Sequence, residues 1–337
     1  MKKRLSSIIT VILAALLLFA AAFGTFGCDR TEPSPGGNGT AEPAENTQAP
    51  ADPTEPPERH EKQNVAKIIL IGGQSNAVGA SLYTYLKGFL DDDKYKALGK
   101  GYENVRTVYY AGEKTATNFT EKRLAINDPQ KLFQKTRYGM SITGTQFGIE
   151  LGLADYFTEN YPDEHIYIIK CARGGIPIKG YWLEGDEYFE RLCEMTEKCC
   201  AVLKDNGYEP EIMAICWLQG ENEGLADSLA KQYYDWQNSV ATRLRDRLKE
   251  YAPYGGIPFV DAGISTHWAY YKTVNENKQK FANDSPNNYY IDVIGLGLEY
   301  NKEPHNNPDL PHYDADSMWN LGLEFGRIIV EAYSKVK

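Results

Sequence analysis

Short apolar runs alternate with stretches of helical periodicity, and this alternation restricts the fold more than any other feature of the chain. Five runs have the character of buried strands: residues 67–72, 165–171, 212–218, 258–262 and 289–294. Longer stretches space their apolar residues as amphipathic helices do: 147–160, 188–206, 225–251 and 316–335. The strands are apolar throughout instead of alternating, which indicates burial on both faces. The sequence therefore predicts a three-layer α/β fold, a parallel sheet with helices on both faces.

Residues 83–146 fit this alternation poorly. They are rich in Lys, Tyr and Gly, which predicts an insertion or an elaborated layer of loops. Nothing after Asn64 has the composition of a linker, so residues 64–337 are predicted to form one large domain with a single core.

The first 27 residues have the features of an export signal. Three basic residues at positions 2–4 precede an apolar run from Ile8 to Gly27, and Cys28 follows. A cysteine in this place predicts a lipoprotein signal, with the lipid on Cys28 and the protein anchored to the membrane at the cell surface. The alternatives are an ordinary signal peptide, which gives a secreted protein, and an uncleaved anchor helix.

Residues 28–63 are predicted to be a disordered tether. They hold seven of the 17 prolines and eight acidic residues against three Lys and Arg, with no hydrophobic period. Without residues 1–27 the net charge goes from −10 to −13, because three positive charges leave. An acidic body argues against nucleic acid and anionic lipid as partners, so any membrane contact is expected through the N-terminal lipid alone. Neutral substrates such as polysaccharides remain compatible with this acidic charge.

The cysteines do not form a pattern typical of disulfides or zinc. No CxxC pair occurs, and an odd number remains after Cys28, in apolar strands or in one predicted helix: Cys171, Cys193, Cys199, Cys200 and Cys216. We expect few or no disulfides.

Ser75 stands between two amide side chains where the first apolar strand ends. Ligands of parallel α/β sheets gather at the carboxyl ends of the strands. Three other predicted strands also end in polar, glycine-rich segments: ARGGIP (172–177), QGENEG (219–224) and GISTHW (263–268). We expect the fold to bring these segments and Ser75 to one rim.

A serine hydroxyl needs a base to take its proton and a third group to orient that base. Of the five histidines, His312 has Asp309 three residues before it. In a tight loop this spacing lets the carboxylate reach Nδ1 and leaves Nε2 free to face a serine. The alternative is a surface histidine beside a loop or capping acid.

An ester carbonyl oxygen that becomes an oxyanion also needs hydrogen-bond donors. The Ser75 N–H is one candidate. The Gly174-Gly175 pair exposes backbone N–H groups at a strand end, and Gln219 offers a side-chain amide. The alternative is that the glycines only form a turn and that Gln219 only ties loops together.

Taken together, these stretches resemble the sialate O-acetylesterase and acetylxylan esterase group of the SGNH hydrolases over residues 66–335. GGQSNAVG (72–79) is similar to the nucleophile block, with Ser75 as nucleophile. ARGG (172–175) is similar to the glycine block, with Gly174, or alternatively Gly175, as oxyanion donor. WLQGENEG (217–224) is similar to the third block, which puts Gln219 at the oxyanion hole.

DLPHYDAD (309–316) resembles the terminal Asp-x-x-His block, with His312 as base and Asp309 as helper acid; in this group the glutamate of the third block, here Glu221, is a second helper. The wider superfamily carries Gly-Asp-Ser and Gly-x-Asn-Asp blocks, so the match is to the carbohydrate-esterase branch. The resemblance implies a flavodoxin-like sheet and a serine esterase that removes O-acetyl groups from an acetylated polysaccharide or sialic acid. This chemistry needs no cofactor and no metal.

Aromatic residues near the predicted rim are candidates for stacking on sugar faces. We expect Trp182 and Trp268 to bind substrate in this way, although aromatic residues more often only pack in a core.

Two other functions fit parts of the sequence. His305, Asp309 and His312 lie in one loop and are spaced to hold a metal, which would make a metal-dependent hydrolase. The signal and tether fit equally well a non-catalytic, tethered carbohydrate-binding lipoprotein, but such a protein has no need for Ser75, Asp309 and His312 together.

Overall fold

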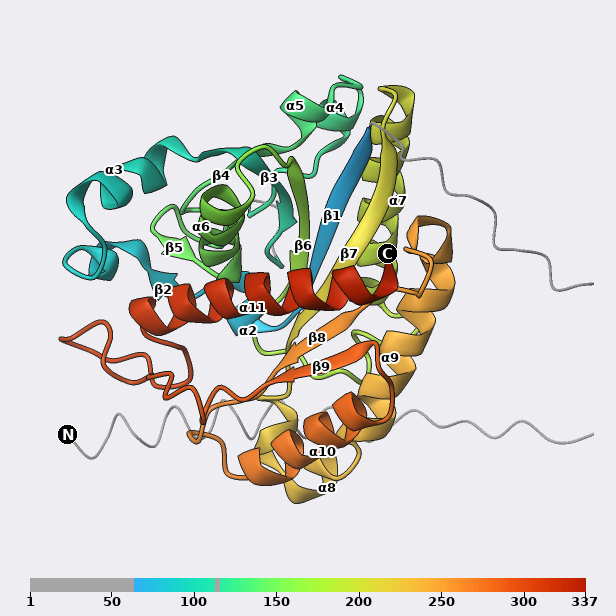
Figure 1. Cartoon of the computed structure of the whole chain (residues 1–337). Coiled ribbons are helices and arrows are strands. Elements are labelled where there is room, and N and C mark those ends of the chain that lie inside the picture. Colours follow the sequence, from blue (N-terminus) through green and yellow to red (C-terminus); the bar gives the residue numbers. More distant parts are fainter. Residues whose placement is uncertain (1–63, 113–115) are drawn as a thin grey trace, which may run out of the picture. The chain divides into compact units, whose positions relative to one another are not determined.

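A seven-stranded sheet forms the middle layer of the computed structural model, which describes residues 64–112 and 116–337 (Figure 1). Its order is β4 (Gln134–Thr136), β3 (Tyr102–Tyr110), β6 (Ile166–Ala172), β1 (Val65–Gly73), β7 (Glu209–Leu218), β8 (Phe259–Ala262) and β9 (Asn288–Ile291). All neighbouring strands are parallel except β3 and β4. The predicted α/β class is confirmed, and the five predicted strands correspond to β1, β6, β7, β8 and β9.

Both faces of the sheet are covered, as the continuously apolar strands indicated. Ile68 and Leu70 of β1 pack into a core with α7 (Glu187–Asp205), α9 (Tyr233–Arg247) and α10 (Tyr271–Asn283). Ile69 and Ile71 pack on the opposite face with α6 (Ile149–Asn160) and α11 (Ala315–Val336). Successive side chains of a strand point to opposite faces, so a strand between two helical layers must be apolar at every position.

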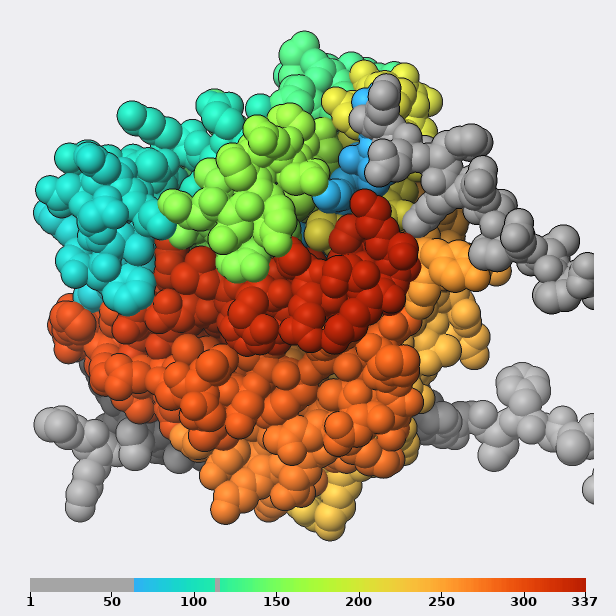
Figure 2. Space-filling view, in the orientation of Figure 1, coloured from blue at the N-terminus to red at the C-terminus, as the bar shows by residue number. Residues whose placement is uncertain are grey.

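Helices α6 and α11 contact each other over the same face of the sheet, and the atoms of the two segments adjoin at the surface (Figure 2). Gly152 and Gly322 meet at their crossing: a β-carbon on Gly152 would be 2.3 Å from the Trp319 carbonyl oxygen. The absence of side chains at these two positions lets the backbones approach closely. The helix that follows the His312 loop, α11, is thereby held against α6.

Residues 83–146 are more than the predicted insertion. They supply β3 and β4 to the central sheet, together with η1 (Tyr83–Leu86), α3 (Asp92–Lys100), α4 (Glu121–Leu124) and α5 (Pro129–Leu132). A short antiparallel ribbon of β2 (Ser81–Leu82) and β5 (Gln146–Phe147) stands apart from the main sheet.

The predicted helix at 225–251 is broken into η2 (Glu223–Leu225), α8 (Asp227–Ala230), α9 and η3 (Lys249–Tyr251). Helix α10 was not predicted at all.

The strand order creates a switch point beside β1. After β1 the chain builds β3 and β6 on one side, and β7, β8 and β9 follow on the other. The loops after β1 and β7 therefore leave in opposite directions, which opens a crevice at their carboxyl ends.

The predicted export signal (1–27) and tether (28–63) lie outside the described residues. Within the described ones, no helix has the length and apolar character needed to cross a membrane. The five described cysteines are all free and buried.

Candidate active site

Ser75 is the first residue of α2 (Ser75–Val78), the short helix that begins directly after β1. The turn depends on Gly73, whose φ is 137° and whose β-carbon would lie 2.0 Å from the Leu218 carbonyl oxygen. The Gln74 N–H donates to that same oxygen at 2.8 Å, and the Gln74 side chain is buried. The ends of β1 and β7 thus hold the turn and leave Ser75 half-buried at the switch point.

A cleft of about 390 Å³ opens at Ser75. Gly174 lies against the serine, since a β-carbon built on the glycine would be 3.5 Å from Ser75 Cβ. His312, Asp309 and Gly175 also line this cleft. The predicted rim therefore exists: the segments after β1 and β6 and the loop before α11 meet in one cavity.

His312 and Asp309 form a hydrogen-bonded pair. Asp309 Oδ2 lies 2.7 Å from His312 Nδ1, and the His312 N–H donates to the Asp309 carbonyl oxygen at 3.2 Å, which closes a tight turn. The side chains are 20% and 47% exposed, so the imidazole is more sheltered than the carboxylate. With Nδ1 engaged, Nε2 is the ring nitrogen available to a group in the cleft. No hydrogen bond joins His312 to Ser75 in the described residues, and such contacts often form only with substrate bound.

Glu221 has a different partner from the predicted one. Its buried Oε1 accepts a hydrogen bond of 2.6 Å from Asn76 Nδ2, and no hydrogen bond or ion pair joins Glu221 to His312 among the described residues. Asn76 directly follows the nucleophile position. Glu221 is therefore hydrogen-bonded to the serine turn, and its role as a second helper acid stays a prediction.

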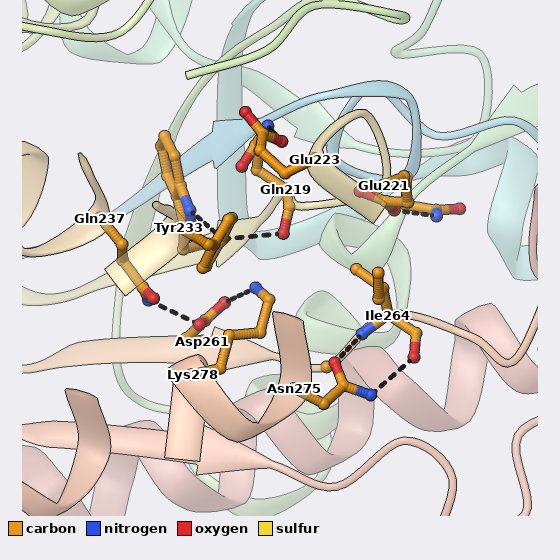
Figure 3. Close-up of polar contacts among 12 residues, drawn as sticks. Gln219, Glu221, Glu223, Tyr233, Gln237, Asp261, Ile264, Asn275 and Lys278 are labelled. Carbon is orange, nitrogen blue, oxygen red and sulfur yellow. Dashed lines mark hydrogen bonds and ion pairs between the residues drawn. The ribbon is translucent and has the colours of Figure 1, made fainter. Parts of the chain in front are cut away.

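Gln219, the predicted oxyanion donor, directly follows β7 as expected, but its side chain is engaged with protein groups. It is fully buried below the cleft, and its amide nitrogen donates to Glu223 Oε2 at 2.6 Å (Figure 3). Glu223 Oε1 in turn accepts from the Ile178 N–H at 2.7 Å, and burial raises the pKa of its carboxyl group. Its amide contacts protein groups, and Gln219 does not itself line the cleft, so its role as an oxyanion donor stays a prediction.

A match to a known protein family identifies the class of enzyme to which this site belongs. The family model described as carbohydrate esterase, sialic acid-specific acetylesterase matches residues 65–331. The chain belongs to this family. It is a carbohydrate esterase, an enzyme class that removes O-acetyl groups from carbohydrates. The resemblance stated from the sequence motifs is thereby confirmed.

Solved structures show the same fold as this esterase. A protein from Arabidopsis thaliana is 18% identical, with 80% of this chain and 99% of that one covered and a TM-score of 0.57. The protein named NanS is 14% identical, with 81% and 99% covered and a TM-score of 0.55. A search of curated proteins gave no match.

The two tryptophans predicted to bind sugar have different places in the esterase. Trp182 is 0% exposed and packs edge-on against Trp217, with ring centroids 4.8 Å apart, so it is a core residue and cannot stack on a sugar. Its prediction was wrong because the loop after β6 folds back into the core. Trp268 is partly buried and lines the cleft.

Asn222 is a cleft residue that the sequence did not single out. Its N–H donates to Gln74 Oε1 at 3.3 Å, and its Nδ2 donates to the Gly175 carbonyl oxygen at 2.8 Å. Asn222 thus ties the glycine segment to the serine turn. The only available signal was its position between the two acids of QGENEG.

Residues 83–146, predicted to be an insertion, also reach the cleft through Ile142 and Gln146.

The side chains of the predicted metal-site alternative are not arranged to hold a metal together. His305 Nδ1 lies 3.1 Å from the Lys302 carbonyl oxygen, and the His305 ring packs edge-on against Tyr85. Among residues 64–112 and 116–337, no three metal-binding side chains come together.

Proposed function

We propose that the esterase works by a Ser-His-Asp acyl-enzyme mechanism, with Ser75 as nucleophile, His312 as base and Asp309 as helper acid. The observation that carries the proposal is the 2.7 Å hydrogen bond from His312 to Asp309 beside a cleft that Ser75 also lines. The carboxylate fixes the imidazole tautomer with a proton on Nδ1, so Nε2 can accept one.

The reaction proceeds in two halves. Ser75 Oγ bonds to the acetyl carbonyl carbon while its proton passes to His312 Nε2. The tetrahedral intermediate then expels the sugar oxygen, which takes that proton, and the acetyl group stays on Ser75. Water adds to the acyl-enzyme and gives one proton to His312; the proton then passes to Ser75 Oγ as acetic acid leaves, which ionises to acetate in solution.

Backbone N–H groups hold the oxyanion. Ser75 N–H lies at the start of α2, and Gly174 lies against Ser75; neither N–H has a backbone partner among the described residues. Asn222 keeps the glycine segment in place, and the buried Gln219–Glu223 pair supports it from below. Each such donor contributes about 10²–10³ in turnover.

The proposed substrate is an acetylated carbohydrate, either a polysaccharide or a sialic acid, and its contact with Trp268 is supported by the position of this residue in the cleft lining.

The decisive experiment measures acetate release from an acetylated glycan. Ser75→Ala should lower kcat by about 10⁴-fold or more, since removing the nucleophile disables the whole unit. Ser228→Ala, an exposed serine on α8, is the matched control and should retain full activity. Activity that survives in Ser75→Ala would overturn the mechanism, and a wild-type protein that binds the glycan without releasing acetate would favour the binding lipoprotein.

The location of the esterase is a separate proposal. Residues 1–27 act as a lipoprotein signal, Cys28 takes the lipid, and residues 28–63 tether the catalytic domain to the cell surface. Cys28→Ser should move the protein from the membrane fraction to the soluble fraction after expression in a bacterium that lipidates proteins. Retention of Cys28→Ser on the membrane would contradict the lipid anchor.

A further inference from the structure

A second cavity of about 250 Å³ adjoins the catalytic cleft. Four residues line both cavities: Ala80, Gln146, Asp309 and His312. The two cavities are therefore neighbours, and the His312–Asp309 pair lies in the wall that they share.

The remaining wall of the second cavity is well fixed. Ser81 Oγ donates to the Tyr313 carbonyl oxygen at 2.7 Å, and Leu82 pairs with Gln146 in the β2–β5 ribbon. Glu303 Oε2 accepts from the Ala315 N–H at 2.8 Å, at the start of α11. A cavity with walls held in this way exists before a ligand arrives, which lowers the entropic cost of binding.

Two acceptors in this wall have no donor among the described residues. Gln146 Oε1 is buried without a hydrogen-bond partner, and Glu303 Oε1 accepts no hydrogen bond. Of the two, only Gln146 Oε1 is buried, and an unpaired buried acceptor is costly unless a ligand supplies the donor. Sugar hydroxyl groups are donors of the required kind.

The charged side chains in the wall of the second cavity favour neutral sugars over acidic ones. The carboxylates of Glu303 and Asp309 both line the second cavity. They repel a sugar that carries its own carboxylate, such as a uronic or sialic acid, and they accept hydrogen bonds from neutral sugars.

We propose that the second cavity is a glycan subsite that holds a neutral sugar unit next to the acetylated one. The preferred substrate is then an acetylated neutral oligosaccharide or polysaccharide, not an acetylated monosaccharide. This inference rests on the proposed function, because the leaving sugar oxygen takes its proton from His312, which lines both cavities.

The first test compares chain lengths. Wild-type kcat/KM should be at least about tenfold higher for an acetylated neutral trisaccharide than for the acetylated monosaccharide, because remote binding energy is used in the transition state. Leu82→Trp fills the subsite and should lower kcat/KM for the trisaccharide about tenfold more than kcat/KM for p-nitrophenyl acetate. Leu296→Trp is an exposed control that lines neither cavity and should change neither value.

The second test changes the charge and keeps the shape. Glu303→Gln retains an acceptor for the Ala315 N–H and should raise kcat/KM about fivefold for an acetylated oligosaccharide containing a uronic acid, relative to its neutral counterpart.

Equal kcat/KM for the monosaccharide and the trisaccharide, or a neutral-to-acidic ratio unchanged in Glu303→Gln, would overturn the subsite. Wild-type hydrolysis of p-nitrophenyl acetate that depends on Ser75 would still stand in that case, so the failure of the subsite is distinguishable from failure of the mechanism.

Discussion

Two lysine–carboxylate pairs, one on each side of β1, are buried to the same degree but differ in how directly they contact the serine turn. Lys170 on β6 contacts Glu150 on α6 at 2.9 Å, and Lys278 on α10 contacts Asp261 on β8 at 2.6 Å. All four side chains are 0% exposed. The two pairs differ in the further group that each lysine contacts besides its carboxylate.

Lys170 Nζ also donates to the Val78 carbonyl oxygen at 3.0 Å, at the last residue of the nucleophile helix α2. The Glu150 carboxylate accepts from the Gly148 N–H at 3.0 Å. This pair therefore ties the serine turn directly to β6 and α6.

Lys278 lies instead over the Tyr233 ring, 4.8 Å from its centroid, and Asp261 accepts a second hydrogen bond of 2.6 Å from Gln237 (Figure 3). Tyr233 OH donates to the Gln219 carbonyl oxygen at 3.0 Å, so this pair reaches the site only through two intermediate residues. Burial of a charged pair thus does not by itself indicate a contribution to catalysis. What matters is whether the lysine also contacts the serine turn, as Lys170 does and Lys278 does not.

Lys170→Met should have the largest effect. It leaves Glu150 buried and unpaired, which costs about 3–5 kcal/mol of unfolding free energy. It also removes the donor to Val78, so kcat should fall about 10²-fold with little change in KM, because a misplaced nucleophile loses transition-state contacts. Denaturant unfolding and steady-state kinetics measure the two effects.

The double variant Lys170→Met/Glu150→Leu separates stability from positioning. Replacement of both charges by apolar groups should recover most of the stability, while kcat stays low because Val78 still lacks its donor. Recovery of kcat together with stability would show that Lys170 is only structural.

Lys278→Met should have a comparable effect on stability and a small one on catalysis. We expect a loss of about 3–5 kcal/mol, since Asp261 is left unpaired, and a kcat within about threefold of wild type. A drop in kcat as large as that of Lys170→Met would remove the distinction between the two pairs.

The free energy of unfolding should also depend on pH through the Lys278–Asp261 pair, and this effect should be smaller than those of the substitutions above. Burial raises the pKa of Asp261 from 3.8 to about 6. The folded state then holds this proton more tightly than the unfolded state, so the contribution is full below pH 4 and is lost as the pH rises through 6.

Asp261→Asn removes this titration. The stability difference between wild type and Asp261→Asn should therefore favour wild type more at pH 4 than at pH 7. Urea unfolding at the two pH values measures it, and an identical difference at both would contradict the raised pKa.

The sequence predicted the elements that a strong local pattern marks and missed those that depend on distant partners. The strands buried between two helical layers were evident from their apolar runs. β3 was missed because YENVRTVYY mixes polar and apolar residues. α10 was missed because its sequence is largely polar, and it buries Lys278 against Asp261 on another element.

The same distinction applies to the site. The Asp309–His312 contact spans three residues, so its spacing can be interpreted locally. The partners of Glu221 and Gln219 include residues 145 positions away, and whether Trp182 faces the cleft or the core depends on how a loop folds back. No spacing along the chain carries that information.

The central claim is that Ser75 is activated by His312 across the cleft, and active-site labelling tests it most directly. A fluorophosphonate probe followed by peptide mass spectrometry should place the label on Ser75 in the wild type, with a labelling rate at least about 10³-fold lower in His312→Ala. A label on another residue, or an unchanged rate in His312→Ala, would contradict the account.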